Sequence, residues 1–244
     1  DAVTSTRVPG KHGAFFLGGT RNDLTGERDL LVVDLGGHDR HDLTVARAPR
    51  RGFGDVRVIV DAGGRDVYLS RELPLAGGFC GVGLIWDVWG DEVYDAHACS
   101  LGAGVLGAGL LIDEHGDGSY RVMDTGQGYA MFGIGMLVDL EGTDSYHARG
   151  LSQGAGYTGG VALLVDHRGH DSYYVNGGEK DFRGDFFDSN GQGYAVGFRE
   201  QASGGIGGVV DGAGNDTYSG DYWAQGVGYW YGLGFLMDRS GNDR

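Results

Sequence analysis

One motif recurs along the chain: an aspartate, a glycine three residues later, an acidic residue five later and a tyrosine seven later. Its clearest copy is DGAGNDTYS, from Asp211 to Ser219. The leading residues, called anchor aspartates below, are 26 or 27 residues apart except for one gap of 45, and they are Asp34, Asp61, Asp87, Asp113, Asp139, Asp166, Asp211 and Asp238. A fixed period of about 20 to 50 residues is typical of solenoids, whose units contact mainly their neighbours. The repeat therefore predicts one elongated domain.

Each unit consists of an apolar run that ends at the anchor aspartate, a turn, and a polar, glycine-rich return. The residues one and three positions before the anchor are large and apolar in nearly every copy, which favours strands. With 51 glycines the chain is unfavourable for helices. We predict an all-β fold, a parallel β-solenoid of about eight coils of 26 residues. Residues 1–29 fit the repeat poorly and are expected to form an N-terminal cap; residues 30–244 form the solenoid, with an inserted loop at 177–190.

Glycines recur four and six residues before the anchor and leave a strip without side chains. Two explanations stay open: a second layer approaches closely on the inside, or the strip is a flat exposed surface for a partner. Stacked coils place equivalent residues about 4.8 Å apart, so that repeated side chains form ladders. We expect an aromatic ladder of His41, Tyr68, Tyr94, Tyr120, Tyr146, Tyr173 and Tyr218. We also expect a ladder of Gln127, Gln153, Gln192 and Gln225, whose amides would bond to one another.

Acidic residues form a second column five positions after the anchors. It contains Asp39, Asp66, Glu92, Asp144, Asp171, Asp216 and Asp243, and Gly118 interrupts it. Two unit charges 4.8 Å apart repel by roughly 1 kcal/mol in water and about 3.5 kcal/mol at an effective dielectric constant of 20, so the columns need compensation. In one explanation the carboxylates accept backbone N–H bonds in a turn whose glycine supplies a positive φ. In the other, they bind cations such as Ca²⁺, which prefers oxygen ligands.

The turn resembles the RTX calcium-binding repeat, the nonapeptide GGxGxDxUx that builds a parallel β-roll. GAGNDTYSG, from Gly212 to Gly220, is the best match, and AGGRDVYLS and SGNDR are weaker ones. The resemblance implies a Ca²⁺ cofactor and inward-facing tyrosines, with Asp66, Asp144, Asp171, Asp216 and Asp243 as ligands. RTX motifs run in tandem, whereas here each coil has one copy and an aspartate replaces the leading glycine. The pattern is also similar to that of uncharacterised Gly/Asp-rich repeat proteins of bacteria, which implies no activity.

We take as candidate metal ligands the acidic pairs of five turns. They are Asp61, Asp66, Asp139, Asp144, Asp166, Asp171, Asp211, Asp216, Asp238 and Asp243. We predict no catalytic residues, because the acidic residues follow the repeat instead of interrupting it and no HxH or HExxH motif occurs.

Charge and composition limit the partners. A net charge of −15 disfavours nucleic acid and anionic membranes, and no apolar run approaches the ~20 residues that span a bilayer. We expect a protein or polysaccharide partner, or assembly with further copies or into a larger structure, outside the cell or at its surface. The chain begins at Asp1 without Met and ends inside a repeat, so we expect a mature or trimmed fragment.

The insertion at 177–190 is the one clear break in the repeat, and solenoids often bind ligands at such loops. It either covers the glycine strip or contacts a ligand through Asp181, Phe182, Asp185, Phe186 and Phe187. The leading functional prediction is an extracellular, cation-stabilised structural or binding module. The alternative is a carbohydrate-active enzyme, a polysaccharide lyase or hydrolase, with its site near this insertion.

Overall fold

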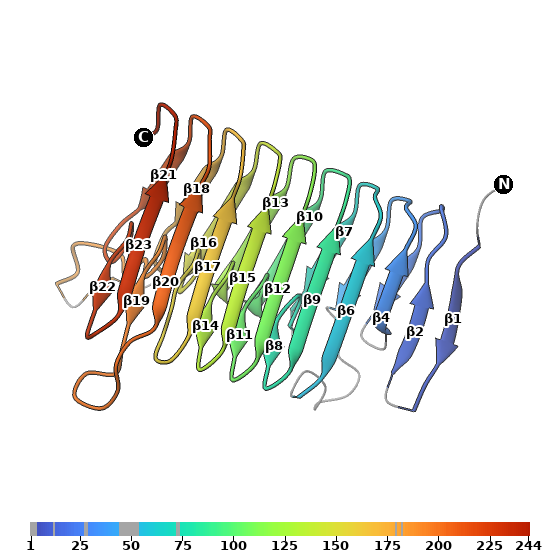
Figure 1. Cartoon of the computed structure of the whole chain (residues 1–244), viewed down its shortest axis with the longest axis horizontal. Coiled ribbons are helices and arrows are strands. Elements are labelled where there is room, and N and C mark those ends of the chain that lie inside the picture. The colour runs from blue at the N-terminus through green and yellow to red at the C-terminus, as the bar shows by residue number, and fades with distance from the viewer. Residues whose placement is uncertain are drawn as a thin grey trace.

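The protein is an all-β parallel solenoid whose coils stack along one axis, with the two termini at opposite ends (Figure 1). The computed structural model describes residues 4–11, 13–26, 29–43, 54–71, 74–178, 180–181 and 183–244. These residues contain no helix, and hence none that could cross a membrane. The predicted fold class is confirmed.

The larger of the two main sheets has ten strands. In spatial order they are β1 (Thr6–Pro9), β2 (Ala14–Leu17), β4 (Asp29–Asp34), β6 (Val56–Asp61), β9 (Val82–Asp87), β12 (Ala108–Asp113), β15 (Ile134–Asp139), β17 (Val161–Asp166), β20 (Ile206–Asp211) and β23 (Leu233–Asp238). The pairing is parallel except that β1 runs antiparallel to β2 and lies at the N-terminal edge. From β4 onward each strand ends at an anchor aspartate, and the anchors pair in register along the whole sheet.

The second main sheet has eight parallel strands. They are β3 (Leu24–Gly26), β5 (Arg40–Leu43), β7 (Val67–Ser70), β10 (Val93–Ser100), β13 (Ser119–Gly126), β16 (Ser145–Gly150), β18 (Ser172–Val175) and β21 (Thr217–Gly220). Seven anchors are followed by one of these strands, β5 to β21, whereas the last anchor has only β23. The solenoid therefore has about seven complete turns instead of the predicted eight.

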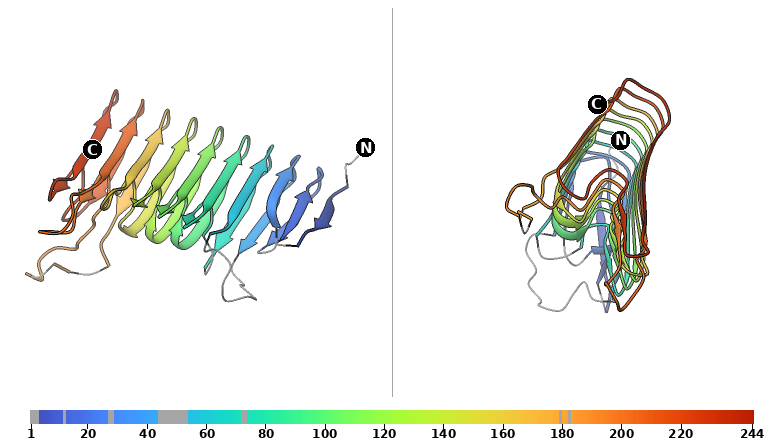
Figure 2. Two further views of the ribbon diagram at one scale, coloured as in Figure 1. Left: turned by 60° about the horizontal axis from the view of Figure 1, so that its bottom comes forward. Right: turned by 90° about the vertical axis from the view of Figure 1, so that its left-hand side faces the viewer.

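Short strands on the return segments form a third layer, visible in the end-on view of Figure 2. They are β8 (Gly78–Phe79), β11 (Gly104–Val105), β14 (Ala130–Met131), β19 (Ala195–Val196) and β22 (Gly228–Tyr229). The glycine strip faces this layer. A Cβ atom at Gly109 would lie 2.1 Å from the carbonyl oxygen of Ala103, and one at Gly135 would lie 2.0 Å from that of Tyr129. The close-approach explanation of the strip is correct, because any side chain there would push the return segments outward.

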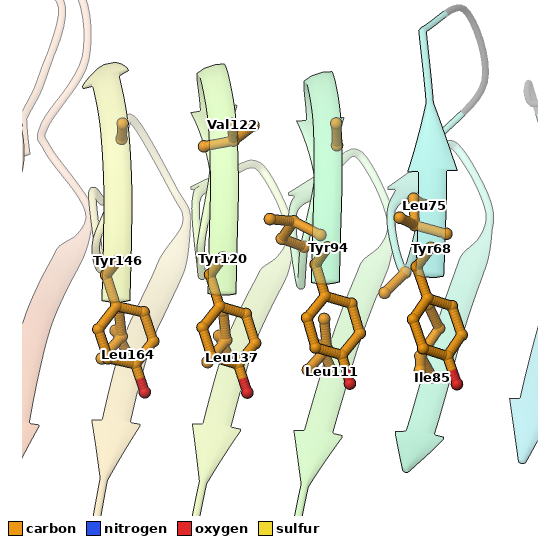
Figure 3. Close-up of a cluster of buried hydrophobic side chains, with 14 of the residues drawn as sticks. Tyr68, Leu75, Ile85, Tyr94, Leu111, Tyr120, Val122, Leu137, Tyr146 and Leu164 are labelled. Carbon is orange, nitrogen blue, oxygen red and sulfur yellow. The ribbon is translucent and has the colours of Figure 1, made fainter. Parts of the chain in front are cut away.

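The core lies between the two main sheets and consists of repeated columns (Figure 3). The residues two positions before the anchors from Asp34 to Asp211, such as Ile85 and Leu111, point inward and are at most 2% exposed, whereas Leu236 in the last coil is partly buried. Against them stands the predicted tyrosine ladder, whose successive ring centroids are 4.8 or 4.9 Å apart. His41 begins the ladder, 4.5 Å from Tyr68. In-register parallel pairing enforces this stacking, since each coil repeats the one before at the strand spacing.

The glutamines also link successive coils, but not through one another as predicted. Gln127 Nε2 donates to the backbone carbonyls of Tyr120, at 2.9 Å, and His147, at 3.2 Å. Gln153, Gln192 and Gln225 make equivalent contacts to tyrosine-strand carbonyls. A backbone φ of +48° at Gln127 turns its side chain towards the second sheet, where the nearest acceptors are main-chain oxygens.

Candidate functional site

The anchor aspartates lie at the inner edge of the large sheet and accept hydrogen bonds from the tyrosine ladder. The Tyr120 hydroxyl is 2.8 Å from Asp113 Oδ2 and 2.5 Å from Asp139 Oδ2. The Tyr218 hydroxyl is likewise 2.9 Å from Asp211 Oδ2. A hydroxyl has a single proton, so each tyrosine can donate to only one carboxylate at a time. The ladder thus satisfies one oxygen of an anchor and leaves the other, Oδ1, directed elsewhere.

The second acidic column uses one oxygen to fasten the turn of the preceding coil. Asp144 N–H donates to Asp171 Oδ1 at 2.7 Å, and Asp171 N–H donates to Asp216 Oδ1 at the same distance. Where the column is interrupted, Gly118 N–H still donates to Asp144 Oδ1 at 2.6 Å. The hydrogen-bonded turn predicted as one explanation is therefore present, and it accounts for one oxygen of these carboxylates.

The remaining carboxylate oxygens are buried and accept no hydrogen bond from the described residues. They are Oδ2 of Asp34, Asp39, Asp66, Asp144, Asp171 and Asp216, Oδ1 of Asp87, Asp113, Asp139, Asp166 and Asp211, and both oxygens of Glu92. All these residues are at most 2% exposed. Buried polar atoms in proteins are nearly always paired, so a row of unpaired carboxylate oxygens indicates a missing positive partner. The hydrogen bonds within the turns do not supply this positive partner.

These carboxylates gather into groups of three whose oxygens lie within 4.8 Å of one another. Five such groups are Asp23–Asp34–Asp39, Asp39–Asp61–Asp66, Asp66–Asp87–Glu92, Asp139–Asp144–Asp166 and Asp171–Asp211–Asp216. Each takes its members from two successive coils. Anchors and second acidic residues thus converge between coils, in a position where one ion would contact both.

Most of the predicted metal ligands belong to these groups. Asp238 and Asp243 lie in the last coil, where Asp238 Oδ2 is 3.1 Å from the Tyr218 hydroxyl and Asp243 Oδ1 accepts the Asp216 N–H. The sequence reasoning did not select Asp23, Asp34, Asp39, Asp87 and Glu92 as ligands, although the last four stand in the repeated acidic columns. Asp23 lies outside the period, so no sequence signal indicated it.

Burial and mutual repulsion raise the pKa values of these carboxyl groups and so disfavour their ionisation. Burial is the largest cause and raises the pKa of Asp66 to about 7, of Asp87 to about 9 and of Glu92 to about 10. Neighbouring carboxylates raise each of these pKa values further, as Asp61 does for Asp66. Ionisation of these groups therefore costs stability unless a cation compensates the charge. A divalent ion would compensate the charge that the protons otherwise remove.

The chemistry of the groups suits a hard cation. The five groups contain only carboxylates, with no histidine or cysteine. Ca²⁺ takes six to eight oxygen ligands at about 2.3 to 2.6 Å, whereas Zn²⁺ sites are commonly built from histidine and cysteine. Three carboxylates can offer up to six oxygens, and one oxygen from each lies within 4.8 Å of the others. The donor set fits Ca²⁺ better than it fits Zn²⁺.

The glycine three residues after the anchor makes room for the acidic side chain. A Cβ atom at Gly142 would lie 2.7 Å from Asp144 Oδ2, and one at Gly64 would lie equally close to Asp66 Oδ2. Neither glycine has the positive φ that we predicted for this position, whereas Gly116 does, at +129°. The positive-φ explanation is therefore wrong for part of the column, where the lack of a side chain is what the turn requires.

The insertion packs beside the return segment of the following coil. Phe187 N–H donates to Asp221 Oδ2 at 2.9 Å, and Phe186 lies 6.4 Å from the Tyr222 ring. The Asp181 carboxylate pairs with Arg183 Nε at 2.6 Å, while Asp185 is exposed. Phe182 lies outside the described residues. The third layer, and not the described part of the insertion, lies against the glycine strip, so the first of the two roles predicted for the insertion is not supported.

A small polar pocket of about 270 Å³ opens beside the insertion. Asp124, Arg149, Asp188 and Asn190 are among its lining residues. None of the five predicted contact residues of the insertion lines it. A ligand at this place would meet the base of the insertion and β16, not the phenylalanines at its tip.

Comparison with known proteins gives no relative, since no family model, curated protein or solved structure matches the chain. The parallel solenoid and its acidic groups agree with what the RTX resemblance implies. No match assigns the chain to that family.

Proposed function

We propose that the chain is a cation-stabilised β-solenoid that acts as an extracellular structural or binding module, with Ca²⁺ held between successive coils. The observation that carries the proposal is the set of buried carboxylate oxygens without hydrogen-bond donors, nearly all on residues that belong to groups of three between coils. Hydrogen bonding in the turns uses the other oxygens and leaves these uncompensated.

An ion in such a group would join two coils at the turn, in addition to the backbone hydrogen bonds that already link them there. A ligand that binds only the folded state stabilises it by mass action, in proportion to the logarithm of its concentration over its Kd. Extracellular calcium modules work with Kd values of about 10⁻⁴ to 10⁻³ M, so a surface or secreted location suits this chemistry. Repetition of the site along the axis would give a stiff rod.

Metal analysis of the purified protein, combined with thermal melts in Ca²⁺ and in excess chelator, tests the proposal. Ca²⁺ should raise the melting temperature and chelator should lower it. Asp171→Asn keeps an acceptor for the Asp144 N–H but removes a ligand from its group, so it should reduce the response to Ca²⁺. Asp117→Asn is the matched control, because Asp117 is an exposed turn residue outside the five groups. An unchanged melting temperature in chelator would contradict the proposal.

The carbohydrate-active alternative has one observation in its favour. The pocket beside the insertion contains two carboxylates, Asp124 and Asp188, together with Arg149, and glycoside hydrolysis commonly uses a carboxylate pair. A screen against polysaccharides for reducing ends or unsaturated products tests this function. Activity that Asp188→Asn abolishes would establish the enzymatic function, and a wild-type protein without activity would exclude it.

A further inference from the structure

The outer face of the large sheet is apolar along most of the solenoid. In β6, β9, β12, β15, β17, β20 and β23 the residues one, three and five positions before the anchor point outward. Every one of these positions is apolar or, at Gly208, lacks a side chain. Several are well exposed, among them Val56 and Leu233 at 58% and Ile134 at 52%. We call this surface the outer apolar face.

The other main sheet shows that this composition is not a general property of the fold. Its outward positions include charged residues such as Asp95 of β10, which forms an ion pair at 2.9 Å with Arg71, directly after β7. The two sheets have similar lengths and the same parallel pairing. The outward surface of the eight-stranded sheet is thus partly charged, whereas that of the large sheet is apolar.

The outer apolar face is at the upper end of the apolar patch sizes found on monomeric proteins, where such patches are often functional. Seven strands at about 4.8 Å spacing, each with six residues at about 3.3 Å, give a surface of roughly 30 by 20 Å, on the order of 600 Å². Monomeric proteins seldom expose contiguous apolar patches above a few hundred Å². A stable protein interface buries about 800 Å² on each partner, and homodimer interfaces are the more apolar ones. With the exposed Phe15 of β2 and Leu31 of β4 added, the face approaches that size.

We infer that the outer apolar face is a dimerisation surface, on which a second copy of the chain packs sheet against sheet. Parallel, in-register strands give the face columns of side chains with one constant period, as the aligned strands of Figure 1 indicate. A second copy presents the same period, so a two-fold axis makes the columns of each copy fit between those of the other at the ~10 Å spacing of packed sheets. The inference uses no metal site and is independent of the proposed function.

Charge favours a second copy over a lipid surface. The protein has a net charge of −15, and proteins that lie on anionic membranes place lysine and arginine around their apolar face. Trp86, at the margin of the face, donates from Nε1 to the carboxylate of Glu114 at 2.8 Å. The net negative charge of the protein repels anionic lipid. It also repels a second copy, so the dimer must depend on apolar contact and should strengthen as salt screens the repulsion.

Sedimentation of the full chain tests the inference. We expect a dimer at concentrations of about 1 to 100 µM, with a lower Kd at high salt. Met136→Glu places a charge in the centre of the face and should raise the dimer Kd by about 100-fold or more. Met123→Glu is the matched control: the same change on an outward residue of β13, in the opposite sheet, should leave the dimer intact.

Circular dichroism and melting temperature show whether each variant folds. If Met136→Glu is unfolded, Leu110→Thr, which retains strand propensity, should still weaken the dimer. A wild-type chain that stays monomeric at about 100 µM overturns the inference, as does a Met136→Glu protein that dimerises like the wild type. A monomer that sediments with phosphatidylcholine vesicles or with an insoluble polysaccharide also overturns it and identifies the other occupant.

Discussion

Replacement of Asp66 by asparagine should change the stability of the protein in opposite directions with and without calcium. Asp66 belongs to two of the carboxylate groups, one with Asp39 and Asp61 and one with Asp87 and Glu92. Its Oδ1 accepts the Asp39 N–H at 2.5 Å, a bond that the asparagine oxygen can retain, and its Oδ2 has no donor. The substitution therefore keeps the turn bond and removes only the charge.

The pKa of Asp66 gives the expected magnitude. Burial, followed by repulsion from Asp61, raises it from 3.8 to about 7. Because the folded state holds the proton more tightly than the unfolded state, the raised pKa costs no stability below pH ~4 and costs most above pH ~7. At pH 8 the cost is at most about 4 kcal/mol, and water near the turn should reduce it to about 2 kcal/mol. Asp66→Asn should recover that amount in the metal-free protein, a rise of roughly 4 to 8 °C in melting temperature.

Thermal melts of wild type and Asp66→Asn at pH 8, each in chelator and in saturating Ca²⁺, measure the effect. We expect the variant to melt higher than wild type in chelator and lower in Ca²⁺, since it has lost a ligand from two groups. At pH 4 in chelator the two should coincide. If the variant melts lower than wild type in both conditions by the same amount, the carboxylate serves only the turn and the reasoning is refuted.

Three further outcomes follow from the same structure. The metal-free protein should lose stability as pH rises from ~4 to ~9, because the buried carboxyl groups with raised pKa values must release protons, and saturating Ca²⁺ should reduce this loss in pH-dependent melts. Tyr120→Phe should lower the melting temperature by an amount equivalent to about 1 to 3 kcal/mol by removing the hydroxyl that lies between two anchors and donates to one of them, whereas the exposed Tyr174→Phe should have little effect. Gly109→Ala should destabilise by at least ~3 kcal/mol in urea titration, because its Cβ would collide with Ala103, while Gly26→Ala meets only ordinary contacts.

The sequence was sufficient to predict the solenoid because its strongest signals are periodic. A spacing of 26 or 27 residues fixes the coil length, and the in-register tyrosine ladder follows from it without any further assumption. The role of the glycine strip was harder to predict, since glycine permits both close packing and an open surface. Only the position of the return segments distinguishes close packing from an open surface, because the Tyr129 carbonyl oxygen lies where a Cβ atom at Gly135 would need space.

The inward and outward faces of the large sheet were not distinguished by the pattern. Apolar residues stand on both faces of these strands, so alternation gives no direction; Leu111 is buried while Leu110 and Ile112 are partly exposed. The glutamine contacts were missed for a related reason. The left-handed backbone at Gln127 sends the side chain to main-chain oxygens, and a column of identical residues does not reveal which acceptors lie nearby.

The variation among the repeats themselves separates charge from hydrogen bonding in the acidic columns. If the carboxylates served only to accept backbone N–H bonds in turns, asparagine would serve nearly as well and should appear among the copies. All the anchors are aspartate, and the second column contains aspartate, glutamate and one glycine. Asparagine does occur in the same turns, as Asn215 and Asn242, but directly before the acidic position, where the side chain is exposed. The buried positions thus retain carboxyl groups, although a carboxylate is costly to bury. This holds even at Glu92, whose side chain is longer than that of aspartate. A bound cation is the partner that would make the buried charge favourable.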